Sequence, residues 1–173
     1  MSTGGKKIAV IGAGPAGYTA AQELSKNGYT VDIYDKEDRL GGAIYTGIPE
    51  YRMSKIFLDK VFASMKEDKN ITFHFNTKID CERFEGLRKN YDKVLVATGA
   101  QIENTYGFEP GNGLYAGLTL LYDLNIRGNH EYYKKYKKAM VWGGGNVAMD
   151  CARSLVRIID DVSVVYRRSE EEI

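Results

Sequence analysis

The sequence has few of the residues from which metal centres and redox dithiols are built. Its 173 residues include two cysteines and two histidines. Cys81 and Cys151 lie far apart, no CxxC motif is present, and the histidines do not cluster. These features exclude an iron–sulfur cluster, a structural zinc site and a dithiol active site. We therefore expect no metal, and we interpret both cysteines as packing or surface residues.

Long apolar runs and an excess of one charge are also missing. Runs such as IAVI and VLVA fall far short of the roughly 20 residues that span a bilayer, and no charged-then-apolar signal segment opens the chain. The 24 basic and 23 acidic residues nearly cancel, which argues against a nucleic-acid or membrane partner. A hydrophobic content of 43% is enough for a core, so we expect a cytoplasmic globular protein whose anion sites are local.

The sequence does contain two copies of one pattern, in which a strand is followed by a glycine turn, a helix and a second strand. The first copy runs from IAVI through GAGPAG to TVDIYD, and the second from AMVW through GGGNVA to VSVVY. Between them, ITFHF and DKVLVAT predict two more strands, and we expect the second of these, like 162–166, to be buried. The fold class is therefore α/β, with two Rossmann-like dinucleotide-binding domains at residues 1–108 and 109–173.

The segments between these patterns carry weaker signals. RLGGAIYTGIPEYRMSK is too irregular for a regular element and is interpreted as a functional loop, whereas LTLLYDLN predicts a short helix. HEYYKKYKK mixes tyrosine with lysine, which can indicate nucleic-acid stacking, but the balanced charge favours a solvated helix face. His74 and His130 are interpreted as structural, and no catalytic residue is assigned.

The first glycine turn has the full dinucleotide fingerprint. Gly12, Gly14 and Gly17 form GxGxxG between a strand and a helix, and Asp35 follows at the tip of the next strand. The glycines allow a tight turn, close approach of a pyrophosphate and packing of helix on strand, and the helix N-terminus favours the phosphates. Asp35 can accept hydrogen bonds from both hydroxyls of an adenosine ribose.

The second turn differs at the position that selects the ribose. Gly143, Gly145 and Ala148 give the GxGxxA variant. Counting from Gly143 the same number of residues that separates Gly12 from Asp35 leads to Tyr166. Arg167 and Arg168 follow, and arginines there can clasp a 2′-phosphate that a carboxylate would repel. The pattern predicts NADPH at the second turn and a different nucleotide, FAD, at the first. The alternative is that both arginines are surface residues after an edge strand.

Five stretches together resemble a known family: VIGAGPAG, GGAIYTGIPEYRMSK, VLVATGA, GGGNVAMD and VVYRRSEEE. In this order and spacing they are similar to the small (beta) subunit of NADPH-dependent glutamate synthase. They also resemble the flavoprotein parts of dihydropyrimidine dehydrogenase and of ferredoxin-linked transhydrogenases. The resemblance runs from about residue 6 to the end of the chain. GIPEYR and YRRS are more specific than either glycine turn.

The resemblance assigns cofactor roles position by position. In the first domain it implies that FAD is bound by the turn, the acidic residue, the GG loop, the adenine contact and the strand end: Gly12, Ala13, Gly14, Pro15, Ala16, Asp35, Leu40, Gly41, Gly42, Ile48, Ile79, Ala97, Thr98 and Gly99. Ile48, with Pro49, would lie near the flavin. In the second domain it implies that NADPH is bound by Gly144, Gly145, Asn146, Val147, Arg167 and Arg168.

In such proteins NADPH reduces FAD, and electrons pass on to an iron–sulfur domain or a large catalytic subunit. The family also has a cysteine-rich domain before the first turn and a Gly-Asp segment after the NADPH domain, so we expect this chain to be the N-terminal part of such an oxidoreductase, with both domains incomplete at the C-terminal side. Uncovered sheet edges would then favour a homo-oligomer. The alternative function is a non-catalytic nucleotide-binding module that does not retain flavin. Trp142 departs from the small aliphatic residue usual before the glycines.

Overall fold

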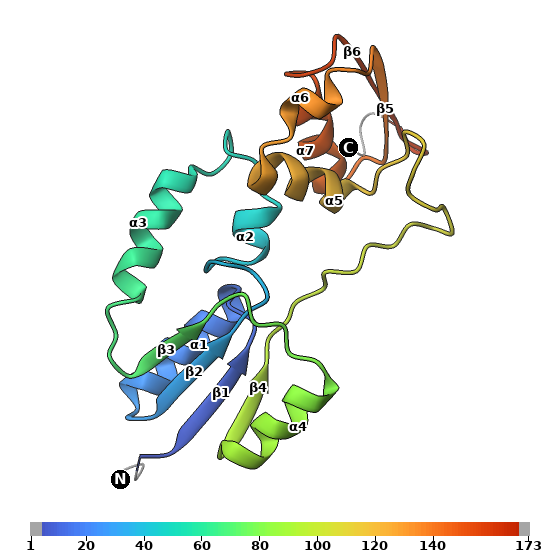
Figure 1. The fold of residues 1–173 in the computed structure, drawn as a ribbon. Helices are drawn as coiled ribbons and strands as arrows, with labels where there is room; N and C mark the ends of the chain where they lie inside the picture. The colour runs from blue at the N-terminus through green and yellow to red at the C-terminus, as the bar shows by residue number, and fades with distance from the viewer. Residues whose placement is uncertain (1–4, 170–173) are drawn as a thin grey trace. The chain divides into compact units, whose positions relative to one another are not determined.

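The computed structural model describes residues 5–169 and divides into two compact units (Figure 1). The first unit comprises Met1–Tyr45 and Ser54–Gln101, and the second comprises Thr46–Met53 and Ile102–Ile173. Each unit therefore consists of two stretches of chain. We call residues 46–53 the strap, because this short stretch packs with a unit whose other residues follow much later. Within the described residues, no helix is long and apolar enough to cross a membrane.

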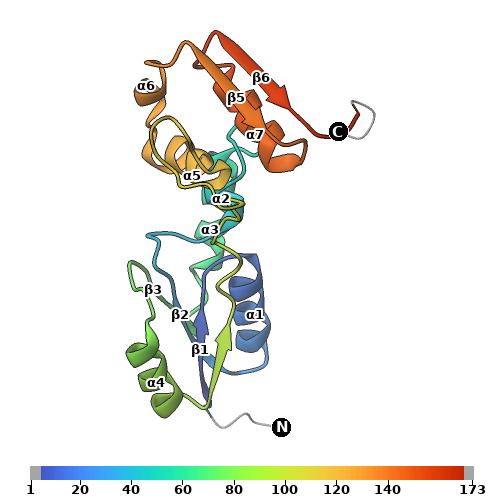
Figure 2. The same cartoon turned by 90° about the vertical axis from the view of Figure 1, so that its right-hand side faces the viewer.

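The first unit is a parallel sheet with helices on both faces. Its strands β1 (Lys7–Ile11), β2 (Thr30–Tyr34), β3 (Ile71–His74) and β4 (Lys93–Val96) lie in the order β3-β2-β1-β4. The helices are α1 (Pro15–Lys26), α2 (Ala43–Thr46), α3 (Lys55–Met65) and α4 (Cys81–Asn90). α1 and α4 cover opposite faces of the sheet (Figure 2). The predicted α/β fold with at least four strands in the first sheet is confirmed.

The strand β1 lies between two other strands of the sheet, and this position explains why its residues are apolar. Ala9 and Ile11 pack with Leu87 of α4, whereas Val10 faces the opposite way and lies beside Gly17 of α1. Ala9 and Val10 are both fully buried. A strand covered on both faces reads as an uninterrupted apolar run, as IAVI does.

One charged residue lies inside this unit and is fully paired. The Asp32 side chain, on β2, accepts hydrogen bonds from Tyr91 Oη at 2.6 Å and is paired with Lys7 Nζ at 2.7 Å and His74 Nε2 at 3.0 Å. Burial raises the pKa of Asp32, but the hydrogen bonds from Lys7, Tyr91 and His74 outweigh burial and hold the pKa below its ordinary value. The network links three strands and Tyr91, the residue after α4, through one carboxylate.

The second unit is built on a two-stranded parallel sheet. β5 (Lys138–Trp142) pairs with β6 (Asp161–Val165), and α7 (Asn146–Leu155) connects them. α5 (Gly117–Tyr122), a π-helical stretch η1 (Asp123–Arg127) and α6 (His130–Tyr133) precede β5. These elements share a core around Leu121, Leu124, Tyr133 and Leu155. The helix predicted from LTLLYDLN is confirmed. Most of HEYYKKYKK is exposed, as the solvated-face interpretation expects, but Tyr133 is buried and donates to Asp123 at 2.9 Å.

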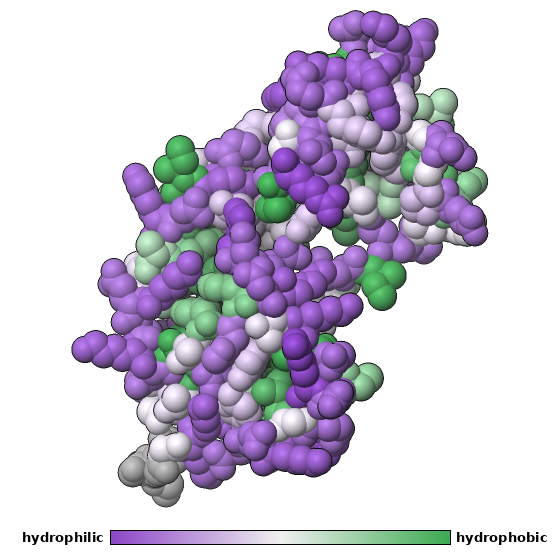
Figure 3. Space-filling model, in the orientation of Figure 1, coloured by the Kyte–Doolittle hydropathy of each residue, from purple (hydrophilic) through white to green (hydrophobic). Residues whose placement is uncertain are grey.

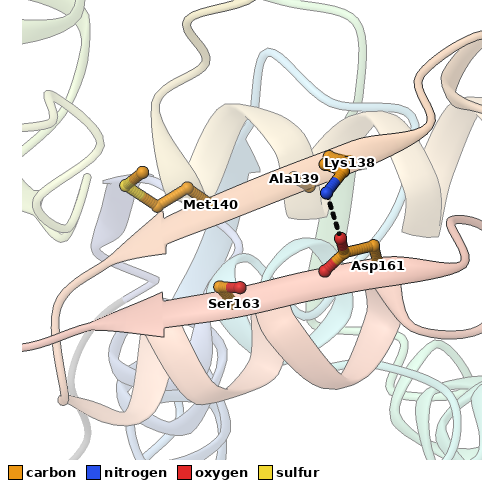
Figure 4. Close-up of a pocket in the computed structure, with 5 residues that line it drawn as sticks. All are labelled: Lys138, Ala139, Met140, Asp161 and Ser163. Atoms are coloured by element: carbon orange, nitrogen blue, oxygen red, sulfur yellow. Dashed lines mark ion pairs between the residues drawn. The ribbon is translucent and has the colours of Figure 1, made fainter.

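Two strands expected to be buried are not. Leu95 and Val96 of β4 are 38% and 58% exposed, and most of β6 is exposed as well. The physical reason is position: within the described residues β4 has a partner strand on one side only, and β5 and β6 have α7 on one face. On the other face Lys138, Met140, Asp161 and Ser163 line an open hollow of about 320 Å³, crossed by a Lys138–Asp161 ion pair of 2.9 Å (Figure 4).

Hydrophilic and apolar side chains are both present on the surface. In the view of Figure 3, hydrophilic side chains predominate, with smaller apolar areas between them. Cys81 is exposed and Cys151 is buried, and both are free thiols, which agrees with their interpretation as surface and packing residues. The candidate functional features are therefore the two glycine turns and the segments around them.

Candidate dinucleotide sites

The first turn, between β1 and α1, has a geometry that only glycine permits. Gly12 has a φ of 108°, and a Cβ on it would lie 2.3 Å from the carbonyl oxygen of Ala97. A Cβ on Gly17 would lie 1.8 Å from the carbonyl oxygen of Gly12. The first glycine thus allows the turn beside β4, and the third allows α1 to pack on the turn, as the fingerprint predicts.

The N-terminus of α1 is open to an anion. The helix begins at Pro15, has no side-chain cap and carries no acidic residue in its first turn. Neither a capping side chain nor an acid within the helix therefore neutralises its first N–H groups and the positive end of its dipole. A Cβ on Gly14 would meet only the Gly42 Cα, at 3.8 Å, so the backbone here is accessible to a ligand. The turn fits a pyrophosphate group of a dinucleotide.

Asp35 is held beside this turn by backbone donors. Its carboxylate accepts the N–H of Ala13 at 2.6 Å and the N–H of Glu37 at 2.8 Å, one at each oxygen. Each oxygen keeps a second lone pair that can accept a ribose hydroxyl. The residue that the sequence assigned to the ribose therefore stands next to the residues it assigned to the phosphates.

The loop predicted to pass over the FAD phosphates also meets the turn. The Gly41 N–H donates to the Ala13 carbonyl at 3.0 Å, and a Cβ on Gly42 would lie 2.9 Å from Gly14 Cα. Leu40 is buried, and its role at FAD stays a prediction. Ala97 and Thr98 lie against Gly12, and Gly99 follows with a φ of 69°. Most of the residues assigned to FAD are thus in one place.

Two residues assigned to FAD are not part of this group of residues around the first turn. Ile79 packs against the cluster of Ala9, Ile11 and Leu87, on the α4 face of the sheet. Ile48 belongs to the strap and therefore to the second unit. The roles of both residues stay predictions.

The second turn reproduces the first in its hydrogen bonding. The Gly143 N–H donates to the Val165 carbonyl at 2.9 Å, as the Gly12 N–H donates to the Tyr34 carbonyl at 2.8 Å. Each glycine thereby binds the last residue of the neighbouring strand. The residues that follow, Tyr166 and Asp35, are consequently equivalent, which is the correspondence predicted by counting along the sequence.

The surroundings of the second turn are also suited to an anion. α7 begins at Asn146 with no side-chain cap and no acidic residue in its first turn, and nothing lies within 4 Å of a Cβ on Gly145. The Tyr166 ring lies on Gly144, where a Cβ would be 2.8 Å from it. Asn146, Val147, Arg167 and Arg168 are all exposed. These residues fit a nucleotide phosphate at the turn and a further phosphate beyond the end of β6.

Trp142 precedes this turn and takes part in an aromatic cluster. The Trp142 ring centroid lies 6.1 Å from that of Tyr106 and 5.5 Å from that of Phe108. All three side chains are at least half exposed. The sequence marked Trp142 as unusual but gave no indication of these two partners, because they come from an irregular segment.

The fold and the two glycine turns are those of a dinucleotide-binding protein. A family model described as pyridine nucleotide-disulphide oxidoreductase matches residues 6–171, and the chain belongs to this family. The expected family relationship and fold class are confirmed. At the level of the family, the predicted cofactor pair of FAD with a pyridine nucleotide is confirmed as well.

Curated relatives and solved structures agree with this assignment. The chain is 38% identical to the beta subunit of NADP(+)-dependent formate dehydrogenase from Moorella thermoacetica, over 99% of the chain and 25% of the relative. It is 33% identical to the small chain of glutamate synthase (NADPH) from Escherichia coli K12, over 98% of the chain and 38% of the relative. FprA from Mycobacterium tuberculosis, solved with NADPH, matches with a TM-score of 0.81 and 24% identity, over 95% of this chain and 44% of FprA. The chain thus spans less than half the length of each of these proteins.

Proposed function

We propose that the chain forms the nucleotide-binding part of an NADPH-dependent flavin oxidoreductase, with FAD on the first turn and NADPH on the second. In such a pair, a hydride passes from the nicotinamide to the flavin, which can release electrons singly. The chain's own contribution is to hold each phosphate chain at a helix N-terminus and to select each ribose. Onward transfer to an iron–sulfur partner, as in a glutamate synthase small subunit, is part of the same proposal.

The observation that carries the proposal is the structural equivalence of Asp35 and Tyr166. The matched Gly12–Tyr34 and Gly143–Val165 hydrogen bonds fix this equivalence. The first turn therefore has a carboxylate at the ribose position, and the second has an aromatic residue followed by two exposed arginines. A carboxylate suits the free ribose hydroxyls of FAD, and a guanidinium suits the 2′-phosphate of NADPH.

The names of the relatives support the nucleotide and the reaction class. NADP(+) or NADPH is named for the formate dehydrogenase subunit, for the glutamate synthase small chains and for an NADPH-Fe(3+) oxidoreductase subunit from Geobacter sulfurreducens. These names describe subunits of larger assemblies. A partner subunit that takes electrons from the flavin is therefore the partner we propose.

The test is reduction of bound flavin by NADPH. Purified chain is incubated with FAD and freed of excess, and the flavin absorbance is followed under anaerobic conditions on addition of NADPH or NADH. We expect a yellow protein that NADPH bleaches at lower concentration than NADH. Protein that stays colourless after incubation with FAD would contradict the proposal and favour a nucleotide-binding module without flavin.

The arginines provide the second part of the test. Arg167→Ala and Arg168→Ala each remove a donor to the 2′-phosphate, so NADPH affinity should fall about tenfold per arginine, while NADH affinity stays within about twofold. Lys138→Ala is a matched control, because it removes an exposed cation at the opposite end of β5. Equal losses for NADPH and NADH would refute the assignment of the arginines.

A further inference from the structure

The strap is anchored to α7 by an ion pair between residues far apart in the sequence. One guanidinium nitrogen of Arg52, Nη1, lies 3.0 Å and 2.8 Å from the two carboxylate oxygens of Asp150. The Asp150 side chain is 8% exposed and that of Arg52 is 43% exposed. A nearly buried carboxylate needs a compensating partner, because an unpaired buried charge is strongly destabilising. Here the strap supplies that partner.

Tyr51 makes a second set of contacts with the same helix. Its hydroxyl donates to the Asp150 carbonyl at 3.2 Å, and the guanidinium groups of Arg153 and Arg157 lie 4.6 Å and 4.2 Å from its ring centroid. Asp150, Arg153 and Arg157 follow at i, i+3 and i+7, which places them along one side of the helix and its continuation. This side therefore faces the strap, while Cys151 and Leu155 face the core.

The beginning and the interior of the strap are also fixed. The Asn125 side-chain amide donates to the Thr46 carbonyl at 2.9 Å, and the Arg52 and Met53 N–H groups both donate to the Pro49 carbonyl. Pro49 itself is buried. The strap is thus a turn held at both ends, and Arg52 with Tyr51 forms its attachment to α7.

We infer that Asp150 is a positioning residue, which through Arg52 fixes the strap relative to the nucleotide turn at the start of the same helix. Asp150 lies four residues after Asn146, the first residue of α7. The strap is therefore attached about one helical turn away from the glycine turn, through rigid helix backbone. The functional consequence rests on the proposed function and on the predicted role of Ile48, with Pro49, beside the flavin. The ion pair then controls how productively a bound NADPH meets its acceptor, rather than how tightly NADPH binds.

Proteolysis of the full chain tests the anchor without any cofactor. Chymotrypsin can cut after Tyr51 only when the strap leaves α7, and the cleavage rate then follows the opening equilibrium. Because a charged hydrogen bond is lost, Arg52→Gln should be cut about tenfold faster than wild type. Arg52→Lys should stay close to wild type. Synthetic peptides of residues 46–53 with each substitution correct for intrinsic differences in cleavage.

Two further variants make the result specific to this contact. Asp150→Asn leaves the cleaved sequence unchanged and should also raise the rate. Arg127→Gln breaks a similar arginine–aspartate pair in the same unit, that of Arg127 with Asp123 at 3.2 Å, without touching the strap, and should leave the rate unchanged. Cleavage of Arg52→Gln as slow as wild type, or acceleration by Arg127→Gln equal to that by Arg52→Gln, would overturn the inference.

Single-turnover reduction separates positioning from a merely structural role. Arg52→Gln should lower the rate of flavin reduction at saturating NADPH about tenfold while the Kd for NADPH stays within about twofold, and Arg52→Lys should restore most of the rate. An unchanged rate with a strap that opens readily would overturn the positioning role. Failure of the wild-type protein to be reduced by NADPH would instead refute the proposed function, and the proteolysis result would stand independently.

Discussion

Replacement of Gly17 by alanine tests the first turn at its tightest point. A Cβ there would lie 1.8 Å from the Gly12 carbonyl oxygen and 3.3 Å from Val10 Cγ1. The nearest atom belongs to the backbone, so no side chain can rotate out of the way, and α1 must shift by more than 1 Å, at a cost at or above the upper end of about 1–3 kcal/mol for overpacking. Alanine gains about 1 kcal/mol over glycine in a helix interior, which offsets only part of this cost.

Gly86→Ala is the matched control. Gly86 lies inside α4 of the same unit, and nothing lies within 4 Å of a Cβ at this position. The substitution should therefore stabilise the protein by up to about 1 kcal/mol. Urea denaturation followed by far-ultraviolet circular dichroism gives the free energy of unfolding of both variants. If Gly17→Ala proved as stable as Gly86→Ala, the close approach of α1 to the turn would be refuted.

Two other features of the structure lead to measurable outcomes. Asp32 has a folded-state pKa below its ordinary value, so its contribution to stability is complete above about pH 4 and is lost as the pH falls through the folded pKa. Asp32→Asn should therefore be about 1–3 kcal/mol less stable at pH 7 and should lose less stability on acidification, as measured by urea unfolding at several pH values; equal acid sensitivity would contradict the network. Burial raises the pKa of the Cys151 thiol to about 12, whereas Cys81 is exposed. One thiol should thus react with a disulfide reagent in native protein at pH 8 and two in urea, and rapid reaction of both in native protein would show that Cys151 is accessible.

Much of the fold could be predicted because its signals are local. Glycine spacing, apolar runs and the separation of Gly12 from Asp35 all lie within a single βαβ unit. Tyr166, at the same separation from Gly143, is structurally equivalent to Asp35. These signals identify the strands and the turns, because a turn of this geometry admits only glycine at its first position.

The remaining features depend on contacts that one sequence does not encode. DKVLVAT and VSVVY have the composition of buried strands, but composition does not say how many neighbours a strand has, and Leu95, Val96 and Val165 are exposed. The same applies to Arg52 and Asp150, which are 98 positions apart. An arginine in an irregular loop and an aspartate in a helix carry no pattern that would pair them.

The strap also affects the order in which the second unit can form during synthesis. Thr46–Met53 is synthesised well before Ile102–Ile173, and Arg52 must wait for Asp150 while the residues between them emerge. Contacts of such long sequence separation close late in folding, so we expect the contacts of Arg52 and Tyr51 with α7 to form late. A fragment consisting of 102–173 alone would leave Asp150 without its counter-ion, and dissection of this protein into separate domains must therefore keep residues 46–53 with the later segment.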